Sequence, residues 1–139
     1  MSALPRVQSP SDLYELIYVS ALSTGASVTA VPDISRAARL ANPTLGITGL
    51  LVFDGNRFCQ QIEGSMRMVV ELFERISNDA RNDHVSLLHQ GAITQRRYRH
   101  FNVGYPLLEA GDTLADIEAL EGQAAITAFQ ALAFTVHMI

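Results

Sequence analysis

Residues 46–64 read GITGLLVFDGNRFCQQIEG, with two apolar runs on either side of an Asp-Gly pair. The runs 46–53 and 57–62 are rich in β-branched, aromatic and other apolar residues, which predicts two β-strands. An Asp-Gly pair at 54–55 is typical of a tight hairpin turn, because glycine adopts a positive φ without steric cost. The stretch therefore predicts a β-hairpin.

Two adjacent glutamines lie on the second strand of this hairpin. Because successive strand residues point to opposite faces, Gln60 and Gln61 are separated by the sheet, and Cys59 faces away from Gln60. An inward amide needs hydrogen-bond partners, and the Tyr18 hydroxyl offers one. If the turn is a two-residue loop, Gly49 lies opposite Gln60 and clears space above the amide, whereas a bulge shifts the pairing by one residue. The pattern fits a functional pair and a structural Tyr–Gln hydrogen bond equally well.

The remaining elements follow from hydrophobic periodicity and from capping and breaking residues. Thr29 suits a helix N-cap, and that helix should stop at Asn42, because the residue before a proline disfavours helical geometry. The predicted elements are strand 14–20, a helix from 29–33 to 42, strands 46–53 and 57–62, helix 66–76, strands 84–88 and 101–105, and helices 112–120 and 123–139 on either side of Gly122.

The order of these elements predicts an α+β fold, a ferredoxin-like βαββαββ sandwich with C-terminal helices. In that fold the first and third strands are neighbours, so Tyr18 and Gln60 come together without further assumption. We expect a flexible N-terminal lead-in over 1–12, one domain over 13–107 and a C-terminal helical extension over 108–139.

One face of the first predicted helix ends in an amide. Ile34, Ala38, Ala41 and Asn42 recur at helical spacing, so they share a face. The small side chains of Ala38 and Ala41, next to the amide of Asn42, leave room for a planar ligand between this helix and the sheet. Asparagine is also common as a helix C-cap, and periodicity alone favours that simpler interpretation.

Composition excludes several classes of protein. The chain has 139 residues, a net charge of −4, ten arginines and no lysine. This excludes a lysine Schiff base and argues against a nucleic-acid partner, so the Arg-rich stretch 96–100 is interpreted as a solvated turn. A single cysteine excludes an internal disulfide. No apolar run approaches the ~20 residues of a membrane helix, and the N-terminus lacks a signal-peptide core. We expect a soluble cytoplasmic protein without a metal site.

Four stretches together resemble a known family. LIYVS, SRAARLANPTLGITGLLVF, GNRFCQQIEG and RISNDAR are similar to the blue-light-using-flavin (BLUF) photoreceptor domains, over about Leu13 to Tyr105. The pattern N-P-x-x-G-I-T-G-L-L followed by F-x-Q-x-x-E-G is specific at this spacing. BLUF domains are ferredoxin-like, which agrees with the predicted order of elements.

The resemblance implies roles for seven residues and a noncovalently bound FAD, with FMN as the alternative. It implies that Tyr18 gives an electron and then a proton to the excited flavin, and that recombination leaves the amide of Gln60 rotated or tautomerised. The implied cofactor-binding residues are Asn42 at the polar edge of the ring, Ile34 and Ile76 on its two faces, and Arg81 and, more loosely, Asp79 near the ring and its side chain.

Four positions depart from the family pattern. Ala41 replaces a frequent polar residue and Asn82 a usual histidine. Phe101 replaces a frequent tryptophan and Val103 a frequent methionine, both at positions associated with relay of the light signal. The last two departures bear on the output step and on the lifetime of the lit state, and they leave Tyr18, Gln60 and Asn42 in place.

The resemblance implies a blue-light photoreceptor that is not an enzyme and relays its signal to an unidentified partner protein. We expect a homo-oligomer formed through the sheet or the C-terminal helices. One alternative is a flavin-free, BLUF-like protein-binding module, which Ala41, Asn82 and Val103 motivate. A small acylphosphatase-like enzyme ranks last, because the loop 21–26 after the first strand has no arginine to cradle a phosphate.

Overall fold

The computed structural model describes residues 9–27, 29–105, 113–133 and 135–138. The predicted boundary at 107–108, most of the N-terminal lead-in and the predicted start of the first C-terminal helix lie outside these residues. The elements are β1 (Leu13–Leu22), α1 (Ala30–Thr44), β2 (Thr48–Phe53), β3 (Arg57–Ser65), α2 (Met66–Ser77), β4 (Asn82–Ala92), β5 (Phe101–Tyr105), α3 (Thr113–Glu118), α4 (Gly122–Ala133) and β6 (His137–Met138).

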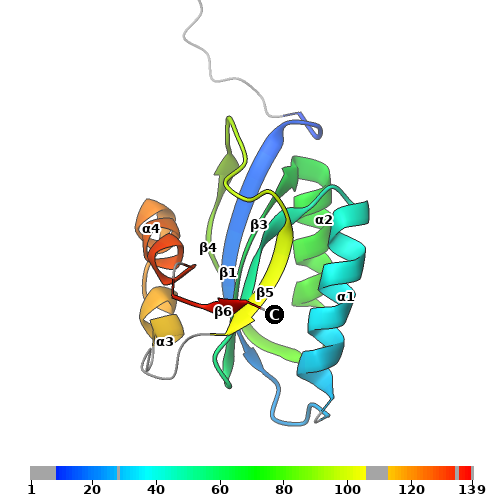
Figure 1. Ribbon diagram of the computed structural model, residues 1–139, viewed down its shortest axis with the longest axis vertical. Coiled ribbons are helices and arrows are strands. Elements are labelled where there is room, and N and C mark those ends of the chain that lie inside the picture. Colours follow the sequence, from blue (N-terminus) through cyan, green and yellow to red (C-terminus); the bar gives the residue numbers. More distant parts are fainter. Residues whose placement is uncertain (1–8, 28, 106–112, 134, 139) are drawn as a thin grey trace, which may run out of the picture.

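The described strands form one sheet in the order β4-β1-β3-β2-β5-β6. β1 is antiparallel to both β3 and β4, and β2 is parallel to β5. Helices α1 and α2 cover one face and α3 and α4 the other (Figure 1). The predicted ferredoxin-like α+β fold is confirmed, with β1 and β3 as central neighbours.

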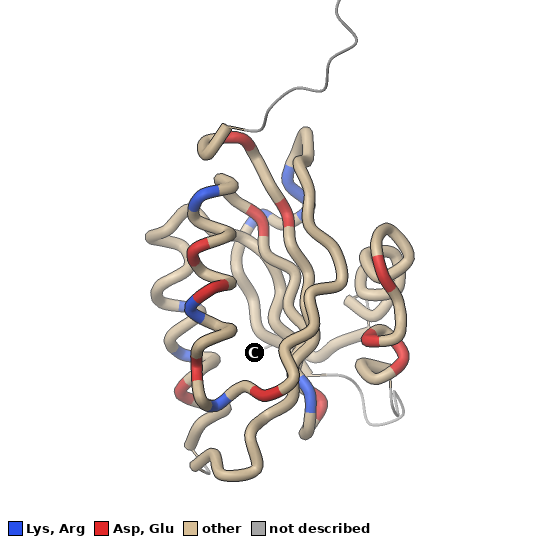
Figure 2. Tube along the Cα trace, turned by 180° about the vertical axis from the view of Figure 1, so that it is seen from behind, with Lys and Arg blue, Asp and Glu red and all other residues tan. Residues whose placement is uncertain are grey.

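The core divides into two layers because both faces of the sheet are covered. Alternate residues of β1 show this division, since Leu16 and Tyr18 belong to the cluster beneath α1 and α2, whereas Ile17 and Val19 belong to the cluster beneath α3 and α4. Helix α2 is amphipathic, and Figure 2 shows acidic and basic residues interspersed along it. Its solvated side therefore carries charges of both signs.

The hairpin register differs from the two-residue loop that the Asp-Gly pair suggested. Leu51, rather than Gly49, lies opposite Gln60, because the turn contains residues 54–57. The Asp54 carboxylate accepts hydrogen bonds from the backbone N–H groups of Asn56 at 2.9 Å and Arg57 at 2.7 Å. These side-chain bonds stabilise a longer turn, as aspartate commonly does.

Helix α1 continues past the predicted stop at Asn42 and includes Pro43. The final turn tightens, since the Asn42 carbonyl accepts from Leu45 N at 3.0 Å and Ile47 N at 2.9 Å. The Thr44 hydroxyl donates to the Ala41 carbonyl at 2.7 Å. These bonds satisfy carbonyls of the last turn, and the helix ends at Thr44, one residue after the proline. At the other end, Thr29 occupies the N-cap position without a side-chain capping bond.

The C-terminal segment contains a strand that the sequence did not predict. Helix α4 begins at Gly122 and ends at Ala133, and residues 137–138 form β6 against the free edge of β5. The periodic apolar residues suggested a helix as far as 139. Pairing with an open sheet edge overrides that local pattern, because an edge strand offers unpaired backbone groups.

Candidate cofactor site

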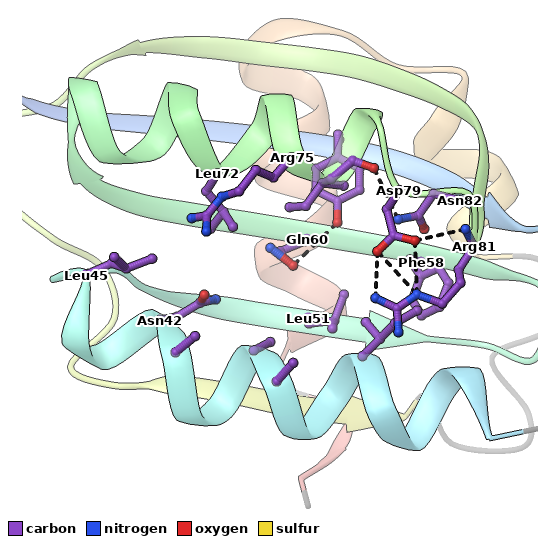
Figure 3. A pocket seen from close by; sticks show the side chains of 16 residues that line it. Asn42, Leu45, Leu51, Phe58, Gln60, Leu72, Arg75, Asp79, Arg81 and Asn82 are labelled. Carbon is purple, nitrogen blue, oxygen red and sulfur yellow. Dashed lines mark hydrogen bonds and ion pairs between the residues drawn. The ribbon is translucent and has the colours of Figure 1, made fainter.

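A cavity of about 250 Å³ lies between α1, α2 and the sheet. Known ligand pockets span roughly 300–1,000 Å³, so this one is small but suited to a flat guest. Figure 3 shows side chains from both helices and the sheet converging on it. All seven residues that the resemblance implied at photoactive or cofactor-binding positions line it, namely Tyr18, Ile34, Asn42, Gln60, Ile76, Asp79 and Arg81.

The register of β1 and β3 brings Tyr18 directly opposite Gln60. The Tyr18 hydroxyl donates to Gln60 Oε1 at 3.4 Å, and each residue is only 3% exposed. The ring of Phe73 packs on Tyr18 with 5.6 Å between ring centroids. The pair is therefore held by the sheet and by α2, but its hydrogen bond is long.

Burial raises the pKa of Tyr18 above the usual value near 10, so the phenol is neutral and keeps its proton. In an unfolded chain this tyrosine ionises near pH 10. Since the folded pKa is the higher one, the contribution of Tyr18 to stability is complete below pH 10 and falls as pH rises further.

We expect no ionisation of Tyr18 in the folded protein up to about pH 10. Ultraviolet titrations of the wild type and Tyr18→Phe should coincide over that range. The difference should appear only where the chain unfolds, as followed by circular dichroism. A tyrosinate signal present in the folded wild type and absent from the variant would contradict the expected burial.

Two buried amides have groups that face the cavity without a protein partner. Asn42 on α1 is 3% exposed and points into the cavity in Figure 3. Among the described residues its side-chain amide makes no hydrogen bond, and neither does Nε2 of Gln60. No fully buried side-chain nitrogen or oxygen of the described residues lacks a partner, so these amide groups are accessible from the cavity and suit a guest with hydrogen-bonding groups along one edge.

The far end of the cavity is charged. Arg81 Nη2 lies 2.6 Å from Asp79 Oδ2, and the Arg81 backbone N–H donates to Asp79 Oδ1 at 2.9 Å. The side-chain hydrogen bond from Arg81 lowers the pKa of Asp79, so this carboxyl is ionised at neutral pH. Asn82, the position of the usual histidine, lines the same end and accepts from the Ser20 hydroxyl at 3.2 Å.

Sequence reasoning missed several lining residues, including Phe58, Leu72 and Arg75. The signal was present for two of them. Phe58 lies two residues before Gln60 on the same strand, and Leu72 lies four before Ile76 on the same helix, so each shares a face with a predicted residue. Arg75 neighbours Ile76 in the last turn of α2 and adds a second guanidinium to the cavity.

The two predicted relay residues do not line the cavity. Phe101 and Val103 on β5 are buried in the core cluster on the same face of the sheet. Val103 lies beside Leu51, which in turn lies opposite Gln60. Leu51 therefore links Gln60 on β3 to Val103 on β5. The relay role of Phe101 and Val103 stays a prediction.

The Arg-rich turn is bound to the sheet by two of its head groups. Although Arg97 is exposed as a residue, its guanidinium pairs with the buried carboxylate of Glu15. Arg96 donates to the Thr48 hydroxyl at 2.7 Å and to the Gly46 carbonyl at 3.0 Å. The residues 96, 97, 99 and 100 are exposed, as expected of a solvated turn, and the head groups of Arg96 and Arg97 also anchor the turn to the sheet.

Comparison with known proteins agrees with this geometry. Residues 13–104 match the family BLUF, described as sensors of blue-light using FAD. The chain is a member of the BLUF family.

Two solved structures share the fold. The chain is similar to BlrB, a BLUF protein whose structure was solved in the dark state. The two are 29% identical and have a TM-score of 0.75 over 90% of this chain and 97% of BlrB. The photo-activated state of BlsA has the same fold, with a TM-score of 0.74 and 23% identity over 86% and 94% of the two chains.

A curated relative is much longer. Photoactivated adenylate cyclase subunit beta of Euglena longa is 33% identical over 88 residues, which are 63% of this chain and 10% of that protein. The chain thus matches about a tenth of that relative's length. Within the described residues, no helix is long and apolar enough to cross a membrane, and no group of three metal-binding side chains gathers.

Proposed function

We propose that the chain is a blue-light photoreceptor that binds FAD noncovalently in this cavity and switches through the Tyr18–Gln60 pair. The observation that carries the proposal is the meeting of three groups at one cavity, namely a protonated phenol, an adjoining amide and the unpartnered amide of Asn42. A planar ring with polar atoms along one edge suits that arrangement.

Each part of the cavity suits a different part of a flavin. Ile34 on α1 and Ile76 on α2 present aliphatic surface to the two faces of a ring, while Asn42 presents donor and acceptor to its polar edge. Arg75 offers positive charge to the phosphate-bearing side chain that FAD and FMN both carry, whereas Arg81, at the other end of the cavity, is paired with Asp79. The family description favours FAD.

A bound flavin supplies absorption of blue light and an excited state that accepts an electron and a proton. Tyr18 holds its proton in the dark, gives up the electron and the proton on excitation and then recovers both, so no atom is consumed. Gln60 emerges with its amide rotated or tautomerised. Each exchanged hydrogen bond is worth roughly 1 kcal/mol, which is enough to bias a two-state element without locking it.

The output is proposed to reach a separate partner protein in the cytoplasm, through β5 or the C-terminal helices. The cyclase activity of the Euglena relative belongs to a protein ten times longer than the matched region, and this chain does not act as an enzyme in our proposal. Self-association through the sheet or the C-terminal helices stays a prediction.

The deciding experiment is an absorption spectrum of the purified chain before and after blue light. We expect a bound flavin whose absorption shifts reversibly to the red. A colourless preparation that also fails to take up added FAD would overturn the proposal and favour the flavin-free binding module.

Asn42→Ala is expected to weaken FAD binding. Loss of one or two hydrogen bonds to the ring edge costs about 1–2 kcal/mol, or roughly 5- to 30-fold in affinity. Titration of the apoprotein with FAD, followed by quenching of flavin fluorescence, measures this change. Asn56→Ala in the exposed hairpin turn is the matched control and should bind FAD as the wild type does. Equal affinities for the two variants would remove Asn42 from the site.

A further inference from the structure

A second buried amide lies on the opposite face of β3 from the photoactive pair. Gln61 is 0% exposed, and its Oε1 accepts from the Tyr98 hydroxyl at 2.8 Å and from Gln130 Nε2 at 2.5 Å. Its Nε2 donates to Glu15 Oε1 at 3.1 Å. Gln130 Nε2 also donates to the Tyr98 hydroxyl at 2.7 Å, which closes a ring of three side chains.

The chemistry of its partners fixes the orientation of this amide. The Glu15 carboxylate, which pairs with Arg97, can only accept, so the Nε2 end of Gln61 must face it. The Oε1 end must then face the two donors. Reversal would break all three bonds, whereas Gln60 has a single bond of 3.4 Å to lose. Within the described residues, the Gln60 amide therefore loses one long hydrogen bond on reversal, whereas the Gln61 amide loses three.

The network joins parts of the chain that are far apart in sequence. Glu15 lies on β1, Gln61 on β3, Tyr98 between β4 and β5, and Gln130 on α4. The Tyr98 backbone N–H also donates to the buried carboxylate of Glu63 at 2.7 Å, which fixes this segment to β3. Arg97 and His89 Nε2, 3.6 Å from Glu15 Oε2, border the network on one side, and Tyr98 packs against the apolar cluster beneath α3 and α4 on the other. A buried polar network in such a setting holds one specific arrangement, because every bond must be made at once.

We propose that Gln61 is a positioning residue that couples the Tyr18–Gln60 switch to helix α4. The inference rests on the proposed photoreceptor function and names the element that receives the signal. Gln60 and Gln61 share one backbone, so any displacement of β3 when Gln60 reverses moves Gln61 against its three partners. The bond to Gln130 passes that displacement to α4.

Coupling between two sites is reciprocal, so a change on α4 must also affect the switch. The network is complete in this structure, and it therefore favours the arrangement of β3 seen here over a displaced one. Removing it lowers the free-energy gap between the two arrangements. Because the network must re-form as the lit state decays, part of this lost stabilisation also raises the barrier to recovery, and the lit state should return to the dark state more slowly.

The test uses the full chain loaded with FAD and the variant Gln130→Leu. We expect it to keep the red shift, to slow dark recovery by at least about fivefold, the lower end of typical allosteric coupling, and to lose the light-induced change in amide hydrogen exchange of α4. Gln123→Leu is the matched control, because Gln123 is an exposed residue of the same helix whose one side-chain bond within the described part of the chain is to Thr127. It should behave as the wild type.

Tyr98→Phe provides a second variant that removes one hydroxyl and keeps the ring in the core. It should show the same slow recovery. The coupling is overturned if both variants keep the red shift, recover within about twofold of the Gln123→Leu control and retain the light-induced change in α4, since typical coupling exceeds that ratio. A wild-type chain that binds no flavin or shows no red shift would instead overturn the photoreceptor proposal.

Discussion

Tyr18→Phe is expected to bind FAD normally and to show no red shift under blue light. The substitution removes the phenol that supplies the electron and the proton, yet it keeps a ring of nearly the same volume against Phe73. The lost hydrogen bond to Gln60 is long and worth about 1 kcal/mol or less, so the fold should persist. Gln60→Leu should give the same result, because it removes the amide that switches.

Tyr14→Phe is the matched control. Tyr14 lies on the same strand and the same face, but its hydroxyl donates to Gln90 Oε1 on β4 at 3.1 Å, and Tyr14 does not line the cavity. This variant should keep the full red shift. Absorption spectra before and after illumination compare these three variants with the wild type. A red shift that survives both Tyr18→Phe and Gln60→Leu would exclude the proposed switch.

Gly49→Ala is expected to prevent folding. Gly49 has φ +153°, and a Cβ there would lie 2.0 Å from the backbone oxygen of Gln61 and 3.0 Å from its carbonyl carbon. The obstacle is the backbone of the central strand β3, which cannot rotate aside as a side chain does. We expect a loss of more than about 4 kcal/mol, which is a large part of the total stability of a typical domain.

Gly46→Ala separates the clash from the cost of backbone strain. Gly46 also has a positive φ, of +71°, but a Cβ there meets nothing within 4 Å. Only the left-handed conformation is then unfavourable, at roughly 1–2 kcal/mol. Urea unfolding of the soluble fraction measures both variants. If Gly49→Ala is no less stable than Gly46→Ala, the close approach of β2 to β3 is not as described.

Local patterns in the sequence were sufficient for the order of elements and for most of the site. Alternation along a strand separated Gln60 from Gln61, and helical spacing placed Ala41 and Asn42 on one face, while the assignment of Asn42 to a cofactor came from the family resemblance. These inferences depend only on the geometry of one strand or one helix. The order of elements then brought Tyr18 to Gln60, because few topologies fit that order.

Interactions between distant segments escaped prediction. The strand at 137–138 exists because β5 offers an edge, and Glu15 is buried because Arg97 and Gln61 reach it from elsewhere in the chain. The predicted two-residue hairpin turn was wrong for a local reason, because the Asp54 side chain accepts hydrogen bonds from the backbone of a longer turn. A pattern of residue types does not reveal which of several possible partners a polar group will meet.

The two-sided construction of β3 also limits how such a protein can evolve in length. Removing a single residue from the strand ahead of Gln60 would turn the amide of Gln61 toward the cavity and that of Gln60 toward α4. The turn before β3, in which Gly55 and Asn56 are exposed, can gain or lose residues one at a time. Within the strand, insertions and deletions that preserve light sensing should come in pairs.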